Sequence, residues 1–174
     1  MTMSEATQET SLKVPLTVNG EDHSVSVTGD ETLLRTLRER LGFTSARETC
    51  GIGLCGACTV LVDGKVVSSC IMLTAQVRDR EVTTAEGLCG PDGRLTSVQE
   101  AFVRRGAYQC SFCIPAMALT VHAALSDEEA GRDCESVREY LAGNLCRCGT
   151  YPEILEAVTD LVAGRQPDRP GAQS

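Results

Sequence analysis

The stretch "CGIGLCGAC", from Cys50 to Cys58, holds three cysteines and three glycines within nine residues. The whole chain has ten cysteines among 174 residues, so the purpose of these thiols decides the class of protein. The first residues, "MTMSEATQET", contain no basic or apolar leader, which predicts a cytoplasmic location. Because the cytosol keeps thiols reduced, this cysteine content favours metal binding over a disulfide framework.

The first set of cysteines follows the spacing C-x4-C-x2-C-x11-C and consists of Cys50, Cys55, Cys58 and Cys70. This spacing is typical of the thiolates that hold a plant-type 2Fe–2S cluster, and it differs from the paired C-x2-C motifs of structural zinc. A cluster bound by four thiolates is anionic, and backbone N–H groups directed at its sulfurs stabilise that charge. A loop that wraps a cluster closely needs residues without a Cβ atom. The glycines that meet this need are Gly51, Gly53 and Gly56.

The second set of cysteines lies in the C-terminal half and consists of Cys110, Cys113, Cys146 and Cys148. A C-x2-C pair is separated from a C-x-C pair by 32 residues. The C-x-C pair is tight for one tetrahedral ion, which favours an iron–sulfur cluster but leaves a zinc site open. Each pair borders a predicted helix, and a helix N-terminus favours an anionic cluster.

Four further residues with metal-binding side chains stand apart from these sets. Cys89 and Cys134 have no cysteine at ligand spacing and are interpreted as unligated thiols. His23 and His122 are isolated, so the two-histidine ligation of a Rieske centre is excluded. We interpret both histidines as structural or exposed.

Charge and hydropathy exclude two classes of protein. The formal net charge is −8, and no stretch gathers Lys and Arg into the basic surface that a nucleic-acid binder needs. No segment approaches the roughly 18 consecutive apolar residues of a membrane span. The hydrophobic fraction of 42% suffices for the packed core of one domain or of two small ones.

The N-terminal half predicts a small α+β domain. Asn19-Gly20 and Asp63-Gly64 are turn signals between short apolar runs, and each predicts a β-hairpin. Between the hairpins, residues 30–42 predict a helix with a leucine face that packs in the core, capped by Asp30 and ended by Gly42. The stretch "REVTTAE" predicts one more short strand.

Helical periodicity begins after a glycine-rich stretch that predicts a linker. Four short helices are expected there: one opened by a capping box of Ser97 and Glu100, one with Pro115 in its first turn, one closed by Gly143, and one in "PEILEAVTDLVAG". The predicted division of the chain is a disordered lead-in at 1–11, an α+β domain at 12–86, a linker at 87–94, a four-helix domain at 95–164 and a tail at 165–174.

Together these motifs resemble a known family. The segments "CGIGLCGACTVLVDG", "GAYQCSFCIPAM" and "AGNLCRCGTYPEILEAV" are similar to those of the small iron–sulfur subunit of the molybdenum hydroxylases. That family includes xanthine dehydrogenase, aldehyde oxidoreductase and aerobic carbon monoxide dehydrogenase. The resemblance covers residues 12–163 with eight cysteines in register. Two stretches depart from the family pattern, since "QCSFCIPA" replaces Q-C-G-F-C-T-P-G and "CRCGTY" replaces C-R-C-T-G-Y.

The resemblance implies a plant-ferredoxin-like β-grasp domain followed by an all-α four-helix domain, each holding one 2Fe–2S cluster. It assigns the first set of cysteines to the first cluster and the second set to the second cluster. Gln109 and Cys148 are implied to lie beside the molybdopterin of a large partner subunit. The first cluster is implied to lie nearer FAD, which a medium subunit carries.

The implied function is that of an electron-transfer subunit in a heteromeric molybdenum hydroxylase, assembled as a dimer of heterotrimers. A molybdenum centre takes two electrons from its substrate at once, whereas iron–sulfur clusters pass electrons singly. Two clusters in series therefore carry electrons one at a time from molybdopterin to FAD or another acceptor. A free-standing two-cluster carrier of the ferredoxin type is the alternative, although a shuttle needs only the first half of this chain.

Overall fold

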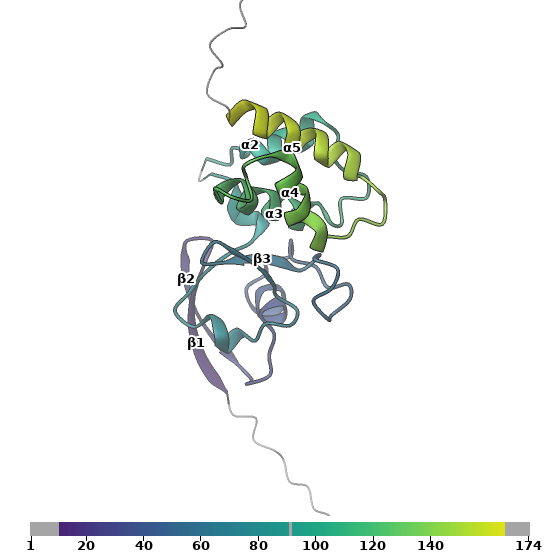
Figure 1. Cartoon of the computed structure of the whole chain (residues 1–174). Coiled ribbons are helices and arrows are strands. Elements are labelled where there is room, and N and C mark those ends of the chain that lie inside the picture. The colour runs from purple at the N-terminus through teal and green to yellow at the C-terminus, as the bar shows by residue number, and fades with distance from the viewer. Residues whose placement is uncertain (1–10, 91, 166–174) are drawn as a thin grey trace, which may run out of the picture.

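The computed structural model describes residues 11–90 and 92–165. A half that contains a β-sheet is followed by a helical half, and the two lie against each other (Figure 1). Residues 1–10 of the expected lead-in and 166–174 of the expected tail lie outside the described residues. Within the described ranges, none of the helices combines the length and apolar character needed to cross a membrane.

Five strands form one mixed sheet with the order β2-β1-β5-β3-β4. The strands are β1 (Leu12–Val18), β2 (Glu21–Val27), β3 (Thr59–Val62), β4 (Lys65–Ser68) and β5 (Glu81–Thr83). Asn19-Gly20 and Asp63-Gly64 close the two hairpins with positive φ at all four residues, as two-residue turns of this kind require. β5 pairs in parallel with β1 and antiparallel with β3, and so joins the hairpins into one sheet. Both predicted hairpins and the predicted last strand are confirmed.

The predicted leucine-rich helix is present in altered form. α1 (Leu33–Arg35) is a single α-helical turn that continues as the π-helical segment η1 (Thr36–Arg40). Its leucines are buried, as predicted. The predicted cap was wrong, because the Oγ1 atom of Thr32, not Asp30, accepts the N–H of Arg35 at 3.3 Å. The backbone is still extended at Thr32, so the helix begins only after it.

The helical half is built around one apolar helix. Its helices are α2 (Ser97–Arg104), α3 (Ile114–Ser126), α4 (Cys134–Tyr140) and α5 (Tyr151–Arg165), and the 3-10 turn η4 (Leu141–Gly143) directly follows α4. Two more 3-10 turns, η2 (Thr74–Val77) and η3 (Ala85–Leu88), precede the helical half. α3 is buried along most of its length and contacts α2, α4 and β3. The predicted capping box was wrong by one residue. Thr96 and Gln99 form the box, in place of Ser97 and Glu100.

Two apolar cores hold the two halves. One core joins the sheet to the leucines of α1 and η1, and it includes Cys58 and Cys70. The other surrounds α3 and includes Cys113, together with Leu61 from β3. The predicted α+β class is therefore confirmed as a mixed sheet followed by helices, and each core reaches one of the two cysteine sets.

Candidate iron–sulfur centres

The first cysteine set is assembled by the loop before β3 and by the end of the β3–β4 hairpin. Cys58 directly precedes β3 and Cys70 follows β4, so the hairpin brings these two buried residues together. Cys50 and Cys55 lie nearer the surface on the same loop. The sulfurs form two pairs of close neighbours, because the Cys55 thiol lowers the pKa of Cys50 and the Cys58 thiol raises the pKa of Cys70.

Backbone N–H groups of the glycine loop point at these sulfurs. The N–H of Gly53 donates to the Sγ atom of Cys70 at 3.3 Å, and the N–H of Leu54 donates to that of Cys50 at 3.4 Å. Such donors, led by that of Ile52, lower the pKa of the Cys50 thiol to about 6. Burial first, and then the neighbouring thiol, raises the pKa of Cys70 to about 11. The glycines of this loop, Gly51, Gly53 and Gly56, all have positive φ.

The second cysteine set is assembled by the segment before α3 and by the loop between η4 and α5. Cys113 occupies the N-cap position of α3 and is buried, whereas Cys110 is exposed. Cys146 and Cys148 are half-buried in the loop that leads to α5. The sulfurs again form two pairs of close neighbours, because Cys110 and Cys148 shift the pKa of each other's thiol, and so do Cys113 and Cys146.

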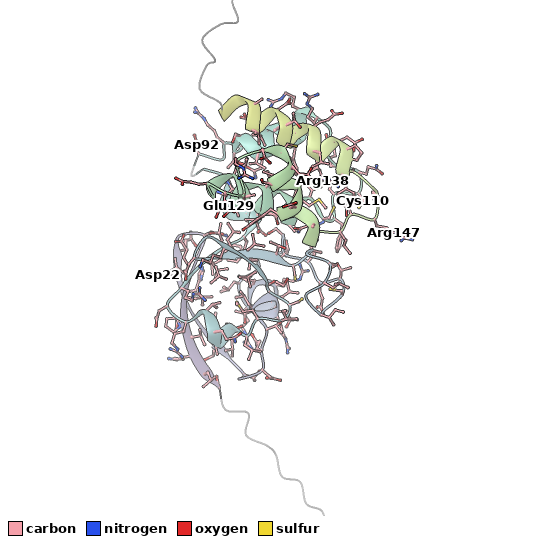
Figure 2. All side chains as sticks on the ribbon, in the orientation of Figure 1. Asp22, Asp92, Cys110, Glu129, Arg138 and Arg147 are labelled. Atoms are coloured by element: carbon pink, nitrogen blue, oxygen red, sulfur yellow. The ribbon has the colours of Figure 1, made fainter. Side chains whose placement is uncertain are left out.

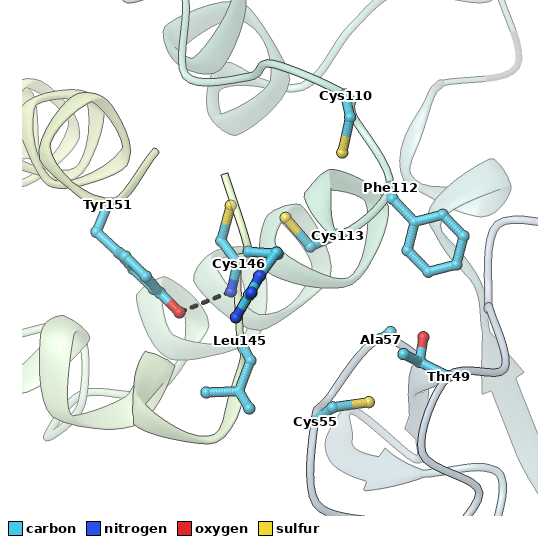
Figure 3. Close-up of a pocket in the computed structure, with 10 residues that line it drawn as sticks. Thr49, Cys55, Ala57, Cys110, Phe112, Cys113, Leu145, Cys146 and Tyr151 are labelled. Atoms are coloured by element: carbon cyan, nitrogen blue, oxygen red, sulfur yellow. Dashed lines mark hydrogen bonds between the residues drawn. The ribbon is translucent and has the colours of Figure 1, made fainter. Parts of the chain in front are cut away.

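Two polar side chains fix Cys146 in place. Its N–H donates to the Oη atom of Tyr151 at 2.7 Å, as the dashed line in Figure 3 shows. Its Sγ atom lies 3.2 Å from the Oγ1 atom of Thr150. Burial would raise the pKa of the Cys146 thiol, but hydrogen bonds from Thr150, Cys113 and Gly149 together outweigh burial and lower that pKa to about 7. At Cys113 burial dominates and raises the pKa to about 12.

This arrangement fits two-iron clusters. Among the residues that the structure describes, no three His, Cys, Asp or Glu side chains converge as a single bound ion would require. The eight sulfurs form four pairs instead, with two pairs in each set. A 2Fe–2S cluster with four cysteine ligands takes two thiolates on each iron, so the two pairs of one set match the two irons of one cluster.

The two sets face each other across the contact between the halves. A cavity of about 630 Å³ lies there, with Cys55 on one wall and Cys110, Cys113 and Cys146 on the other (Figure 3). The N–H of Leu145 donates to the carbonyl oxygen of Cys55 at 3.0 Å. Since Leu145 is bonded to Cys146, one hydrogen bond joins the backbones of the two cysteine loops.

A buried asparagine secures this contact. The side chain of Asn144 is only 5% exposed, and its Nδ2 atom donates to the carbonyl oxygen of Gly56 at 3.1 Å. Its Oδ1 atom accepts the Thr120 hydroxyl of α3 at 3.1 Å. The sequence prediction missed Asn144, Thr150 and Tyr151, and the only signal for them was their position beside the C-x-C pair.

The other residues singled out from the sequence do not belong to the sulfur pairs. Gln109 is exposed beside Cys110, and within the described ranges its side chain makes no hydrogen bond. Figure 2 shows Cys110 at one edge of the helical half, with Arg147 close to it. Cys89 lies 3.4 Å from the Nε2 atom of Gln99.

The last cysteine and the two histidines also lie outside the two cysteine sets. The Sγ atom of Cys134 lies 3.4 Å from the hydroxyl of Thr159. His23 packs edge-on against Phe43, with 6.3 Å between the ring centroids. His122 lies on α3, where burial lowers its pKa.

Comparison with known proteins shows that both cysteine sets lie in regions that match families of iron–sulfur domains. Residues 16–89 match the 2Fe-2S iron-sulfur cluster binding domain, and residues 84–159 match the [2Fe-2S] binding domain. The chain is 40% identical to the nicotinate dehydrogenase small FeS subunit of Eubacterium barkeri, over 84% of this chain and 92% of that protein. It is 38% identical to the xanthine dehydrogenase iron-sulfur-binding subunit of Escherichia coli O157:H7, over 86% and 93%.

A solved structure agrees with these relatives. The crystal structure of quinoline 2-oxidoreductase from Pseudomonas putida 86 matches 87% of this chain and 93% of its own chain, with 36% identity and a TM-score of 0.81. Each of the two matched domains accounts for one cluster, so the protein carries two 2Fe–2S clusters. The chain belongs to the family of small iron–sulfur subunits of the molybdenum hydroxylases.

Proposed function

We propose that this chain carries single electrons between the molybdopterin of a large partner subunit and an electron acceptor, through two 2Fe–2S clusters. The assignment of the cluster ligands rests on the pairing of the sulfurs within each cysteine set. The proposed ligands of the first cluster are Cys50, Cys55, Cys58 and Cys70, and those of the second are Cys110, Cys113, Cys146 and Cys148. When bound, each cluster supplies a site for one electron. The protein supplies the thiolates, the N–H donors and the packing that fix them.

Elemental analysis and spin resonance test this assignment. Native protein should contain about four irons and four sulfides per chain, and its reduced form should show two distinct electron-spin signals. Cys70→Ser should abolish one signal and Cys113→Ser the other, because each removes a buried ligand of a different cluster. One signal in the native protein, or stoichiometric zinc, would refute the assignment.

The contact between the halves supports an order of transfer. Cys110 is exposed at the outer side of the second set, whereas Cys146 is joined to the first cysteine loop through Leu145 and Cys55. We therefore propose that electrons enter at Cys110 and Cys148 and leave the second set through Cys113 and Cys146. The short backbone connection then leads to the first set.

Gln109 and Cys148 are proposed to meet the pterin. The exposed amide of Gln109 offers two donors and one acceptor beside the outer pair of sulfurs, which suits the mixed hydrogen-bonding edge of a pterin. The sulfur of Cys148 is proposed to accept a hydrogen bond from the same cofactor. Gln109→Ala should keep both clusters and slow their reduction by substrate. An unaltered stopped-flow rate at unaltered molybdenum content would refute this role.

Exposed apolar side chains at both cysteine loops support partners on both halves. Ile52, Leu54 and Ile71 beside the first set are each at least 60% exposed, and Phe112 beside the second set is 44% exposed. Clusters of large exposed apolar residues mark interaction surfaces. We propose that the large subunit covers the second loop, and that a medium FAD-carrying subunit covers the first loop in a dimer of heterotrimers. Size-exclusion chromatography of native protein tests this assembly.

The finer description of the fold and location is also a proposal. We assign the sheet, with its parallel β1–β5 contact between two hairpins, to a β-grasp domain at 12–86. We assign α2, α3, α4 and α5 to a four-helix domain at 95–164, joined by a linker at 87–94. The ten thiols favour a cytoplasmic location.

A further inference from the structure

Arg47 connects the two cysteine loops from one side. Its backbone N–H donates to the carbonyl oxygen of Ala57 at 3.0 Å, which fixes it to the first loop. Its Nη1 atom donates to the carbonyl oxygens of Ser111 and Phe112 at 2.9 and 2.8 Å. Both acceptors stand between the two cysteines of the C-x2-C pair, so the guanidinium is held inside the second cysteine loop.

Further contacts hold this guanidinium in one orientation. The Cζ atom of Arg47 lies 4.9 Å from the centroid of the Phe112 ring, within the range of a cation–π contact. Ser111, whose carbonyl accepts from the arginine, has a φ of +61°, a conformation that non-glycine residues rarely adopt. Two carbonyl acceptors and one aromatic face thus leave the arginine little freedom.

Among the residues that the structure describes, Arg47 takes part in no ion pair, in contrast to Arg35, Arg40, Arg80 and Arg105. Arginine side chains in proteins are effectively always charged. A fixed, half-buried cation therefore lies between two sites that would each hold an anionic cluster.

We propose that Arg47 sets the reduction potential of the second cluster and positions its C-x2-C loop. This inference rests on the proposed ligands. Reduction adds one electron, and hence one negative charge, to a cluster, so a fixed nearby cation favours the reduced form and raises the potential. The effect is larger at the second cluster, because the guanidinium donates to two carbonyl oxygens between Cys110 and Cys113, whereas the hydrogen bond of Arg47 to the first loop is made by its backbone.

A redox titration of the native complex tests the proposal, with each cluster followed by its own electron-spin signal. Arg47→Gln removes the charge and keeps an amide that can donate to one carbonyl. At a fixed solution potential, its second cluster should show a reduced-to-oxidised ratio at least tenfold lower than the wild type, which corresponds to 59 mV for one electron. The first cluster should change less. Arg47→Lys keeps the charge, so its second cluster should have a reduced-to-oxidised ratio close to that of the wild type.

Arg78 provides the matched control, because its Nη2 atom also donates to a backbone carbonyl, that of Lys13 at 2.7 Å. Lys13 lies at the start of β1, at the end of the sheet that is remote from the helices (Figure 1). Arg78→Gln removes the same charge and should leave both potentials unchanged. An unchanged second potential in Arg47→Gln, or an equal change in the control, would overturn the proposal.

Two outcomes separate this inference from the assignment beneath it. If wild-type protein holds fewer than two clusters, the proposed function fails. If both clusters are present and only the potential is insensitive to Arg47, this inference fails alone. If Arg47→Gln assembles without its second cluster, the proposal is decided by Arg47→Lys. A reduced-to-oxidised ratio of its second cluster within threefold of the wild type supports the role of charge, and a tenfold lower ratio refutes it.

Discussion

Gly56→Ala tests whether the two cysteine loops are packed as described. Gly56 has a φ of +70°, and a Cβ atom built there would lie 2.5 Å from the carbonyl oxygen of Gly143. It would also lie 2.7 Å from the Nδ2 atom of Asn144 and 3.0 Å from its Cα atom. Real Cβ atoms do not approach backbone so closely, so the loop that leads to the C-x-C pair must move.

The expected cost has two parts. Holding alanine in the left-handed region costs roughly 1–2 kcal/mol. Forcing the adjoining backbone aside costs about 1–3 kcal/mol more, as overpacking of a well-packed site does. We therefore expect Gly56→Ala to lower the free energy of unfolding by roughly 2–5 kcal/mol. That is a large part of the ~5–15 kcal/mol by which folded proteins are stable.

Two neighbouring glycines separate these parts. Gly51 has a φ of +66°, and its added Cβ would meet only the Oε1 atom of Glu48 at 3.6 Å, an ordinary contact. Gly53→Ala would meet the Cδ1 atom of Ile71 at 2.7 Å, but that side chain is 60% exposed and can turn away. Both controls should therefore cost only about 1–2 kcal/mol, the backbone strain alone.

Urea titration of the oxidised protein under anaerobic conditions measures the difference. With a slope of about 1–3 kcal/mol per molar urea, the midpoint for loss of visible absorbance should be roughly 1 M lower in Gly56→Ala than in Gly51→Ala. The far-ultraviolet circular dichroism reports the same transition for the backbone. Equal midpoints in the two variants would contradict the packing of Gly56 against Asn144.

Three further changes have defined outcomes. Replacing both Cys89 and Cys134 with Ser should leave iron content and visible spectrum unchanged, and loss of a cluster would contradict the ligand assignment. Asn144→Ala should cost roughly 0.5–1.5 kcal/mol in urea unfolding, because the Gly56 carbonyl loses one donor and keeps those of Thr59; a neutral result would show that the contact is unimportant. The hydrogen bonds from Arg40 hold the pKa of buried Glu31 below the usual range of a glutamate, so this ion pair stabilises the fold fully well above the unfolded pKa and is lost as pH falls through the lower folded pKa. Glu31→Gln should accordingly flatten the acid side of a stability profile, and an unchanged slope would refute this.

Local signals in the sequence predicted most of the fold. Asn19-Gly20 and Asp63-Gly64 required positive φ at two successive residues, and such a requirement can be read from the residue types alone. Pro115 likewise marked the first turn of α3. The caps were placed less well, because Thr96 and Ser97 are both good caps and only the backbone angles decide between them.

Contacts between distant parts of the chain could not be predicted from residue types. The parallel pairing of β1 with β5 joins Thr17 to Glu81, and nothing in either strand specifies that partner. The bond between Cys55 and Leu145 uses only backbone atoms, so neither side chain signals it. The cysteine spacing predicted which thiols form each set, but the pairing within a set follows from how the hairpin and α3 fold.

The exposure of the sulfur pairs bears on why this chain would act within a complex. In each set one pair lies deeper than the other, and in the second set Cys110 is exposed. In the chain alone, a cluster bound there would face solvent, beside the exposed rings of Tyr108 and Phe112. A shuttle protein gains from one exposed cluster that meets successive partners. Here the two loops are instead fixed to each other by Asn144 and by the Leu145 hydrogen bond, so an electron that enters at one loop has a built connection to the other. A fixed connection of this kind is useful when both ends stay occupied by partners, which favours a permanent subunit over a free carrier.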